Sequence, residues 1–407
     1  MKNSKHILVA ITAICLLVLA GSRCMDKNTA STDPRGEAYA GDATCSNCHK
    51  NIHASFLSTA HNKSSSPANR QTVKGNFAPP LNAYFYRPDV KVVMEQRDSG
   101  LYEVAYMNGI EKRASRFDIA VGSGRKAQTY LYWDGDKIFQ LPVSWSVVAN
   151  SWVNSPNYPP HQVRFDRNIP IGCFECHGSY IKVTSTEVAG TRIMDNFDKN
   201  GLVYGIDCER CHGPAARHAL FHETHPGESK ARYMVSYSSL SLQQKTDMCA
   251  VCHSGIHPTI QSTFHFTPGD TLDNHFFAPS VATAVDDIDV HGNQTQLMKA
   301  SQCYIKSASL TCTSCHDTHT SERNNMVAFS LRCMHCHNNE NHNFCTMAPA
   351  LGASITNNCI DCHMPAKPSR LITLLSNGQS SPAPNLVRTH FISIYPEATR
   401  RFIALKK

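Results

Sequence analysis

The sequence predicts a mainly α-helical and irregular fold with a small antiparallel β insertion, and three observations support this prediction. One short cysteine–histidine motif occurs seven times, and six of the seven copies begin between residues 173 and 359. Hydrophobic residues make up 41% of the chain, which leaves little for a side-chain core beneath so many motifs. Between the first and second copies, residues 81–150 have the alternation and the turn residues of antiparallel strands.

Residues 1–24 have the pattern of a signal peptide. Two lysines precede an apolar run over residues 7–20, which is too short to span a membrane comfortably and is followed by small residues. Cys24 stands where a lipidated cysteine can stand, whereas Arg23 departs from the small-residue lipobox, so both a lipoprotein and an unanchored exported protein remain open. No later segment is long and apolar enough to cross a bilayer. We therefore expect a periplasmic or outer-surface location, with any membrane anchor at this end.

The repeated motif is C-x-x-C-H, and its seven copies use 14 of the 18 cysteines. Two thiols three positions apart lie on one side of a helical turn, where they can add to the two vinyl groups of one haem. The adjacent histidine then binds the iron as its proximal ligand. The sequence therefore predicts seven covalently bound c-type haems. The motif residues are Cys45, Cys48 and His49; Cys173, Cys176 and His177; Cys208, Cys211 and His212; Cys249, Cys252 and His253; Cys312, Cys315 and His316; Cys333, Cys336 and His337; and Cys359, Cys362 and His363.

Zinc binding and disulfide formation explain this pattern less well. A zinc site needs a second ligand pair at a fixed distance and has no use for a histidine after every cysteine pair. Disulfides do not require the histidines at all. The four remaining cysteines are Cys15, Cys24, Cys303 and Cys345. In an oxidising compartment we expect a disulfide between Cys303 and Cys345, with two free thiols as the alternative.

The β insertion at residues 81–150 is predicted from alternation and turns. Tyr102, Val104 and Tyr106 alternate with other residues, and three turn sequences occur at residues 98–100, 108–109 and 134–136. We expect a structural role for this sheet, either covering haems or shaping an edge, with docking of a partner as the alternative.

The remaining segments follow from the motif positions. Residues 25–40 are polar and are expected to form a flexible tether. Residues 41–80 then form the first haem segment, and residues 151–407 form a six-haem domain. Because the motifs are dense, the porphyrins themselves are expected to form the core, with short helices and loops around them.

The formal net charge of +7 does not indicate a nucleic-acid partner. Cleavage of the signal peptide removes three cations, and each haem adds two propionates, so the mature holoprotein is expected to be net negative. Basic side chains are therefore expected to neutralise propionates rather than phosphates.

The surroundings of several motifs resemble a known family. The segments are GDATCSNCH at residues 41–49 with STAH at 58–61, CERCHGP at 208–214, HGNQ at 291–294, CTSCHDTH at 312–319 and CIDCHMP at 359–365. They resemble the multihaem cytochromes related to the tetrahaem cytochrome of ammonia oxidisers, in the superfamily of hydroxylamine oxidoreductase and octahaem tetrathionate reductase. The resemblance implies mostly bis-histidine haems in close-packed parallel and perpendicular pairs. It implies distal ligands at His61, His218, His291, His319 and His390, with His161 and His342 as further candidates.

The chain also departs from the enzymes of that superfamily. Pentahaem nitrite reductases have a lysine in place of the motif histidine at the catalytic haem, whereas all seven motifs here end in histidine. Hydroxylamine oxidoreductase uses a tyrosine cross-linked to its catalytic haem, and nothing marks one of the 14 tyrosines for that role.

Three functions follow from these features. The first is electron relay through closely packed bis-histidine haems, between a quinol dehydrogenase or another cytochrome and a terminal reductase or extracellular acceptor. The second is an oxidoreductase that acts on a small nitrogen or sulfur oxyanion at one five-coordinate haem. The third is a structural filament of haem proteins. The number of distal histidines separates the first two, because an enzyme needs one open iron; catalytic residues and oligomeric state are not indicated.

Overall fold

The computed structural model describes residues 33–190, 192–277 and 283–405. The expected signal peptide, with Cys15 and Cys24, and residues 25–32 of the expected tether lie outside these ranges. Within them, no helix has the length and apolar character that crossing a membrane requires.

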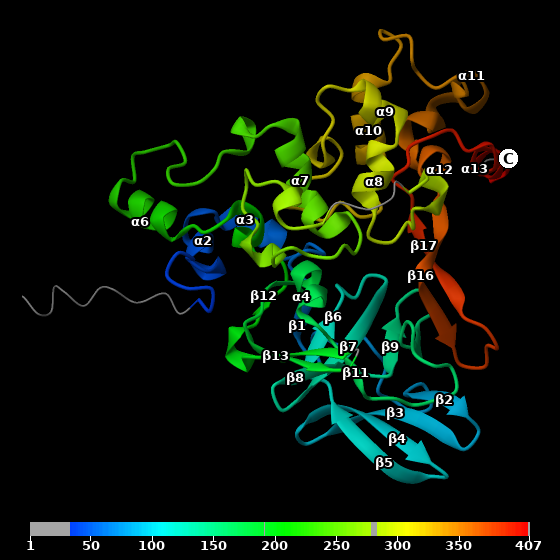
Figure 1. Ribbon diagram of the computed structural model, residues 1–407. Helices are drawn as coiled ribbons and strands as arrows, with labels where there is room; N and C mark the ends of the chain where they lie inside the picture. Colours follow the sequence, from blue (N-terminus) through cyan, green and yellow to red (C-terminus); the bar gives the residue numbers. More distant parts are fainter. Residues whose placement is uncertain (1–32, 191, 278–282, 406–407) are drawn as a thin grey trace, which may run out of the picture.

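The helices lie mostly in one half of the molecule and the two large sheets in the other, as Figure 1 shows. The helices are α2 (Asp42–Cys48), α3 (Lys50–Phe56), α4 (Ile171–His177), α5 (Cys208–His212), α6 (Ala216–Thr224), α7 (Leu242–His253), α8 (Gln294–Lys299), α9 (Gln302–Lys306), α10 (Met326–Cys336), α11 (Ala348–Leu351), α12 (Ile360–His363) and α13 (Pro396–Ala404). Short 3-10 turns, among them η6 (Cys312–Ser314), join them. We call the segments that carry these helices the helical half.

A four-stranded meander, β2-β3-β4-β5, lies at the far end of the sheet half. Its strands are β2 (Ala83–Arg87), β3 (Val90–Arg97), β4 (Gly100–Met107) and β5 (Ile110–Arg116). The predicted turns are confirmed: residues 98–99 join β3 to β4, and residues 108–109 join β4 to β5. Asn108 and Gly109 have φ of 51° and 76°, the left-handed conformation that a two-residue hairpin turn of this type requires at both positions.

A nine-stranded antiparallel sheet lies between the meander and the helices. Its main order is β1-β6-β7-β9-β10-β16-β17, and β8 pairs with both β7 and β11. The third predicted turn, at residues 135–136, joins β7 to β8. The strands are β1 (Ser65–Pro67), β6 (Ile119–Val121), β7 (Ala127–Asp134), β8 (Lys137–Gln140), β9 (Val143–Ser146), β10 (Ser151–Asn154), β11 (Arg167–Asn168), β16 (Ala366–Ser376) and β17 (Ala383–Arg388). We call this sheet and the meander the sheet half.

The prediction of a mainly α-helical and irregular fold with a small β insertion is wrong. Strands begin at Ser65 and continue beyond residue 150, and the C-terminal hairpin β16–β17 completes the large sheet through pairing of Ser376 with Val153. This pairing hides the edge of β10, whose unpaired N–H and C=O groups would otherwise template aggregation. The sequence did not indicate this hairpin, because residues 376–384 have the composition of a loop and prolines such as Pro368 and Pro384 are unusual within strands.

The two hydrophobic clusters of the described residues are built mainly on the sheets. The larger cluster surrounds Trp145, Trp152 and Tyr130, and the second joins Ile119 and Ile138 of the large sheet to Phe174 of α4. Two smaller two-stranded sheets, β12 (Gly178–Tyr180) with β15 (Val203–Tyr204) and β13 (Val183–Ala189) with β14 (Arg192–Phe197), lie beside α4. By contrast, helices α2, α6, α9 and α11 contain no buried residue.

Candidate multihaem site

Six of the seven motifs end helices, and the fifth spans the 3-10 turn η6. His177, His212, His253 and His363 are the last residues of α4, α5, α7 and α12, while His49 and His337 cap the C-termini of α2 and α10. This arrangement places the two thiols and the imidazole of each motif within about one turn. Local sequence explains several of the helix starts, because the side chains of Asp207, Ser241 and Asn325 accept backbone hydrogen bonds as N-caps.

Four motif histidines face a second histidine from a distant segment. The ring centres of His49 and His218 lie 6.4 Å apart, and those of His212 and His319 lie 5.9 Å apart, nearly parallel in both pairs. Two imidazoles that bind one metal ion from opposite sides hold their centres roughly 6 Å apart, because each metal–nitrogen bond is about 2.0 Å. These pairs therefore have the separation of two axial ligands on one iron.

The fourth and fifth motifs have histidine pairs at the same separation, but their ring planes are inclined to each other by 72° and 31°. His253 faces His61 with ring centres 6.2 Å apart, and His316 faces His390 at 6.2 Å. The four distal residues, His61, His218, His319 and His390, are all among those that the family resemblance implied. No ligand bond is part of the structure, so the assignment of each as a ligand stays a prediction that this geometry supports.

The other three expected distal residues are placed differently. His291 lies in electrostatic contact with His177 of the second motif, and burial together with Lys126 lowers the pKa of its imidazole despite the opposing effect of Asp289. His161 and His342 are exposed, and His342 has a left-handed backbone with φ of 52°. Neither of these two has a ring stacked on a motif histidine within the described residues.

Burial favours the unprotonated form of four of the eight paired imidazoles. It lowers the pKa of His61 and His390 to about 4, and it also lowers the pKa values of His212 and His316. A metal ligand must present an unprotonated nitrogen, so these groups are ready to bind over the whole neutral range.

Hydrogen bonds at Nδ1 also orient several rings. Nδ1 of His218 donates to the carbonyl of Arg232 at 2.9 Å, and Nδ1 of His363 donates to the carbonyl of Ser393 at 2.9 Å. His253 contacts the amide oxygen of Gln294 through Nδ1 at 3.2 Å. A proton held at Nδ1 leaves Nε2 free as the iron ligand, which is the usual arrangement around metal-bound histidine.

Thiols of different motifs touch one another, and these contacts order the motifs in space. Direct thiol–thiol contacts join Cys45 to Cys208, Cys176 to Cys252, Cys249 to Cys312 and Cys333 to Cys359. Cys211 lies close enough to Cys252, and Cys315 to Cys336, for their charges to interact. The motifs therefore follow the order first, third, fourth, fifth, sixth and seventh, and the second motif lies beside the fourth.

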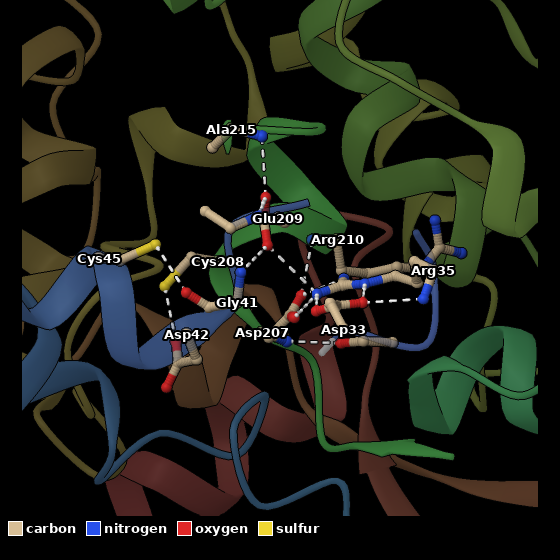
Figure 2. Close-up of polar contacts among 12 residues, drawn as sticks. Asp33, Arg35, Gly41, Asp42, Cys45, Asp207, Cys208, Glu209, Arg210 and Ala215 are labelled. Atoms are coloured by element: carbon tan, nitrogen blue, oxygen red, sulfur yellow. Dashed lines mark hydrogen bonds and ion pairs between the residues drawn. The ribbon is translucent and has the colours of Figure 1, made fainter. Parts of the chain in front are cut away.

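A buried charge cluster fixes the first motif against the third, as Figure 2 shows. Arg35 forms ion pairs with Asp33 at 2.8 Å, Asp207 at 2.7 Å and Glu209 at 3.2 Å, and its side chain is only 4% exposed. Glu209 also accepts the backbone N–H groups of residues 40, 41 and 215. The cluster thereby holds the start of α2 against α5, where Cys45 meets Cys208.

Sequence reasoning missed this cluster. Glu209 stands at a variable position of its motif, and Arg35 lies in a segment that composition marks as a tether. The sequence contains no local pattern that would pair residues more than 170 positions apart.

The expected disulfide between Cys303 and Cys345 is wrong, because both residues are free thiols. Cys303 lies close enough to Cys336 and Cys315, and Cys345 to Cys362, for their charges to interact. The two sulfurs therefore belong to the surroundings of different motifs. The prediction failed because it rested on the redox compartment and not on a distance, and a disulfide requires close approach of both Cβ atoms.

The described residues fit covalently bound haem. Each motif presents two thiols and one imidazole, and four motifs have a second imidazole at the distance of a trans ligand. Helices α2 and α6 bury no side chain of their own, so a large apolar group such as haem would complete their packing.

Comparison with known proteins adds a likeness of shape. No protein-family model and no curated protein matches the chain. Among solved structures, the outer cell wall cytochrome OcwA is similar, with a TM-score of 0.49 and 17% identity over 89% of this chain and 81% of that one. The resemblance to cytochromes of ammonia oxidisers is not tested by these comparisons and stays a prediction.

Proposed function

We propose that this protein is a seven-haem c-type cytochrome that relays electrons between redox partners. The observation that carries the proposal is the set of four histidine pairs, each joining a motif histidine to a distant histidine with ring centres 5.9 to 6.4 Å apart. An iron with two imidazole ligands has no open position, so it exchanges electrons without binding a substrate.

The contacts between motif thiols support a continuous path. They connect six motifs in a row from α2 to α12, and these helices lie toward opposite ends of the helical half in Figure 1. The second motif joins this row beside the fourth, through Cys176 and Cys252. Electrons that enter at one end would thus pass between neighbouring haems to the other, and burial and hydrogen bonds at each imidazole would set the potentials.

Spectroscopy of the purified holoprotein tests the proposal. Pyridine haemochrome quantitation should give seven haems per chain, and low-temperature EPR of the oxidised protein should give low-spin signals from at least the four paired sites. Fewer than seven haems would contradict the haem count. A high-spin signal from the paired sites would contradict the relay.

Catalysis at one open haem is a second candidate, and one observation favours it. His177, His337 and His363 have no histidine ring facing them at the separation of the four pairs, as far as residues 33–190, 192–277 and 283–405 are concerned. An enzyme would use one such site for a small nitrogen or sulfur oxyanion. A high-spin ferric signal of one haem equivalent that changes on addition of nitrite, hydroxylamine or sulfite would favour this function over a pure relay.

We propose export to the periplasm or the outer surface on the basis of residues 1–24. The proposed partners are other redox proteins, such as a quinol dehydrogenase, a cytochrome or a terminal reductase. Intact mass of the protein purified from its native membrane and soluble fractions would decide between a lipidated Cys24 and an unmodified mature end.

A further inference from the structure

A pocket opens in the sheet half where the meander meets the large sheet, and its lining contains no motif residue. Its volume is about 610 Å³, which lies in the usual range for sites that bind small molecules. Strands β4, β5, β7 and β15 contribute to its walls together with the 3-10 turn η1 (Lys199–Gly201). We call it the sheet pocket, and its chemistry is supplied by Arg113, Asp118, Trp133, Asp134, Lys199 and Tyr204.

Two cations of the sheet pocket are held in place without a carboxylate partner. Nη2 of Arg113 donates to the hydroxyl of Tyr132 at 2.8 Å, and the guanidinium carbon lies 4.8 Å from the ring centre of Phe165. Nζ of Lys199 lies 5.4 Å from the ring centre of Trp133. Both cations are exposed, and no carboxylate of the described residues lies within ion-pair distance of either. They can therefore receive an anionic oxygen from a ligand.

The sheet pocket also contains two carboxylates, which differ in how far their oxygens are already used. Asp118 accepts hydrogen bonds from Nε of Arg116 at 2.7 Å and from the backbone N–H of Trp133 at 2.8 Å, so it fixes the wall of the pocket. Asp134 is exposed at the end of β7 and has no ion-pair partner within the described ranges. A carboxylate of this kind can accept hydrogen bonds from the hydroxyl groups of a ligand.

Two half-buried aromatic rings complete the walls. Trp133 is backed by Phe197, whose ring meets it edge to face with the ring centres 6.5 Å apart. Tyr204 is held by the pairing of β15 with β12, in which it lies opposite Gly178. Fixed rings of tryptophan and tyrosine offer a large, rigid and amphipathic contact area to the flat face of a ligand.

Uncompensated cations, an accessible carboxylate and amphipathic rings thus surround one pocket. A ligand that uses all three carries a carboxylate, several hydroxyl groups and an apolar ring face. A purely aromatic anion would gain nothing from Asp134 and would face its charge. We propose that the sheet pocket binds an acidic sugar, such as a uronate unit of a polysaccharide. This inference goes beyond electron relay and does not depend on the proposed haem binding, because the pocket contains no motif residue.

Isothermal titration calorimetry of the full-length holoprotein with trigalacturonate at low ionic strength tests the inference. Saturable binding is expected for the wild-type protein. Arg113→Gln should weaken it about tenfold, because a charge-assisted contact to the ligand carboxylate is lost. Arg87→Gln is the matched control and should leave the affinity unchanged, since Arg87 is an exposed cation of the meander that pairs with Asp89 outside the pocket.

Lys199→Gln is a second test that does not disturb the fold, because within the described residues the Lys199 side chain makes no hydrogen bond. It should also weaken binding. Absence of saturable binding to the wild-type protein, or equal affinity in wild type, Arg113→Gln and Lys199→Gln, would overturn the inference.

Two further ligands test the assignment to an acidic sugar. The neutral trisaccharide maltotriose should bind about tenfold more weakly than trigalacturonate, because it offers no carboxylate to the cations. Tighter binding of naphthoate than of trigalacturonate would overturn the assignment in favour of an aromatic acid. Pyridine haemochrome quantitation of the same samples separates the two proposals, since a count below seven haems would refute the proposed haem content and leave the measured sugar affinity as it is.

Discussion

The two halves of this molecule reach stability by different means. The sheet half has a side-chain core in which Trp152, Tyr130 and Val143 are almost fully buried. In the helical half, α10 buries Ser330 and no apolar side chain, and α2 and α6 bury none of their residues. Helices this short are marginal in water without tertiary packing. The difference indicates that the sheet half folds on its own side chains, whereas α2, α6 and α10 lack a buried apolar side chain and would be completed by the proposed haems.

The largest expected effect is on the protein made without haem attachment. The full chain produced in a host that lacks the c-type maturation system should lose the helical signal in far-UV circular dichroism. All three tryptophans lie in the sheet half, on β7, β9 and β10, so their near-UV signal should persist. A helical signal that stays at the holoprotein level would refute the comparison, as would loss of both signals together.

A single distal histidine should have a smaller, local effect. His319→Ala removes the ring that faces His212 and should convert about one haem in seven from low spin to high spin. EPR of the oxidised protein measures this change. His161→Ala is the control, because His161 is exposed and should leave the spectrum unchanged. Equal spectra for His319→Ala and wild type would rule out His319 as an iron ligand.

The charge cluster at Arg35 should contribute to the folding stability of the helical half independently of any one haem. Arg35→Met leaves three buried carboxylates without their cation, so the free energy of unfolding should fall by about 3 to 5 kcal/mol. Chemical denaturation followed by the Soret band measures it. Arg97→Met, in the exposed pairs with Glu95 and Glu111, should lower it by less than about 1 kcal/mol. Similar losses in both variants would mean that the cluster does not hold the first motif.

The smallest expected effect is a pH dependence in the sheet half. Glu103 is fully buried on β4, its Oε2 accepts the N–H of Val143 at 3.1 Å, and burial raises the pKa of its carboxyl well above the usual range. The unfolded chain loses this proton near pH 4.5 and the folded chain keeps it, so the stabilising contribution of Glu103 is complete below that pH and is lost as pH rises toward the folded pKa.

Glu103→Gln removes this titration. Relative to wild type, the variant should therefore gain about 1 kcal/mol of unfolding free energy per pH unit between pH 5 and pH 7. Thermal unfolding followed by tryptophan fluorescence at several pH values measures the difference. The glutamine amide of the variant can also change the free energy of unfolding by an amount that does not depend on pH. The test is therefore how the difference between variant and wild type varies with pH. A difference that does not vary with pH would show that Glu103 is ionised in the folded protein.

Much of the local structure could be predicted from the sequence. Asn108 and Gly109 both have positive φ and Gly135 has φ of 60°, so these residues supply the backbone conformation that their hairpin turns require. The large sheet could not be predicted in the same way. The edge of this sheet is completed by β16 and β17, which follow β10 by more than 200 residues. No local pattern in residues 366–388 indicates that this segment pairs with β10.

The sequence by itself determined the attachment chemistry. Seven C-x-x-C-H motifs place two thiols and an imidazole within one turn of chain, so each motif contains everything that covalent attachment and proximal ligation require. Only the tertiary structure decided the pairing of His49 with His218, the pairing of His316 with His390 and the order of the motifs. Such contacts join residues far apart in the chain, and only the folded backbone brings the two imidazoles of a pair to the separation that binding one iron would require.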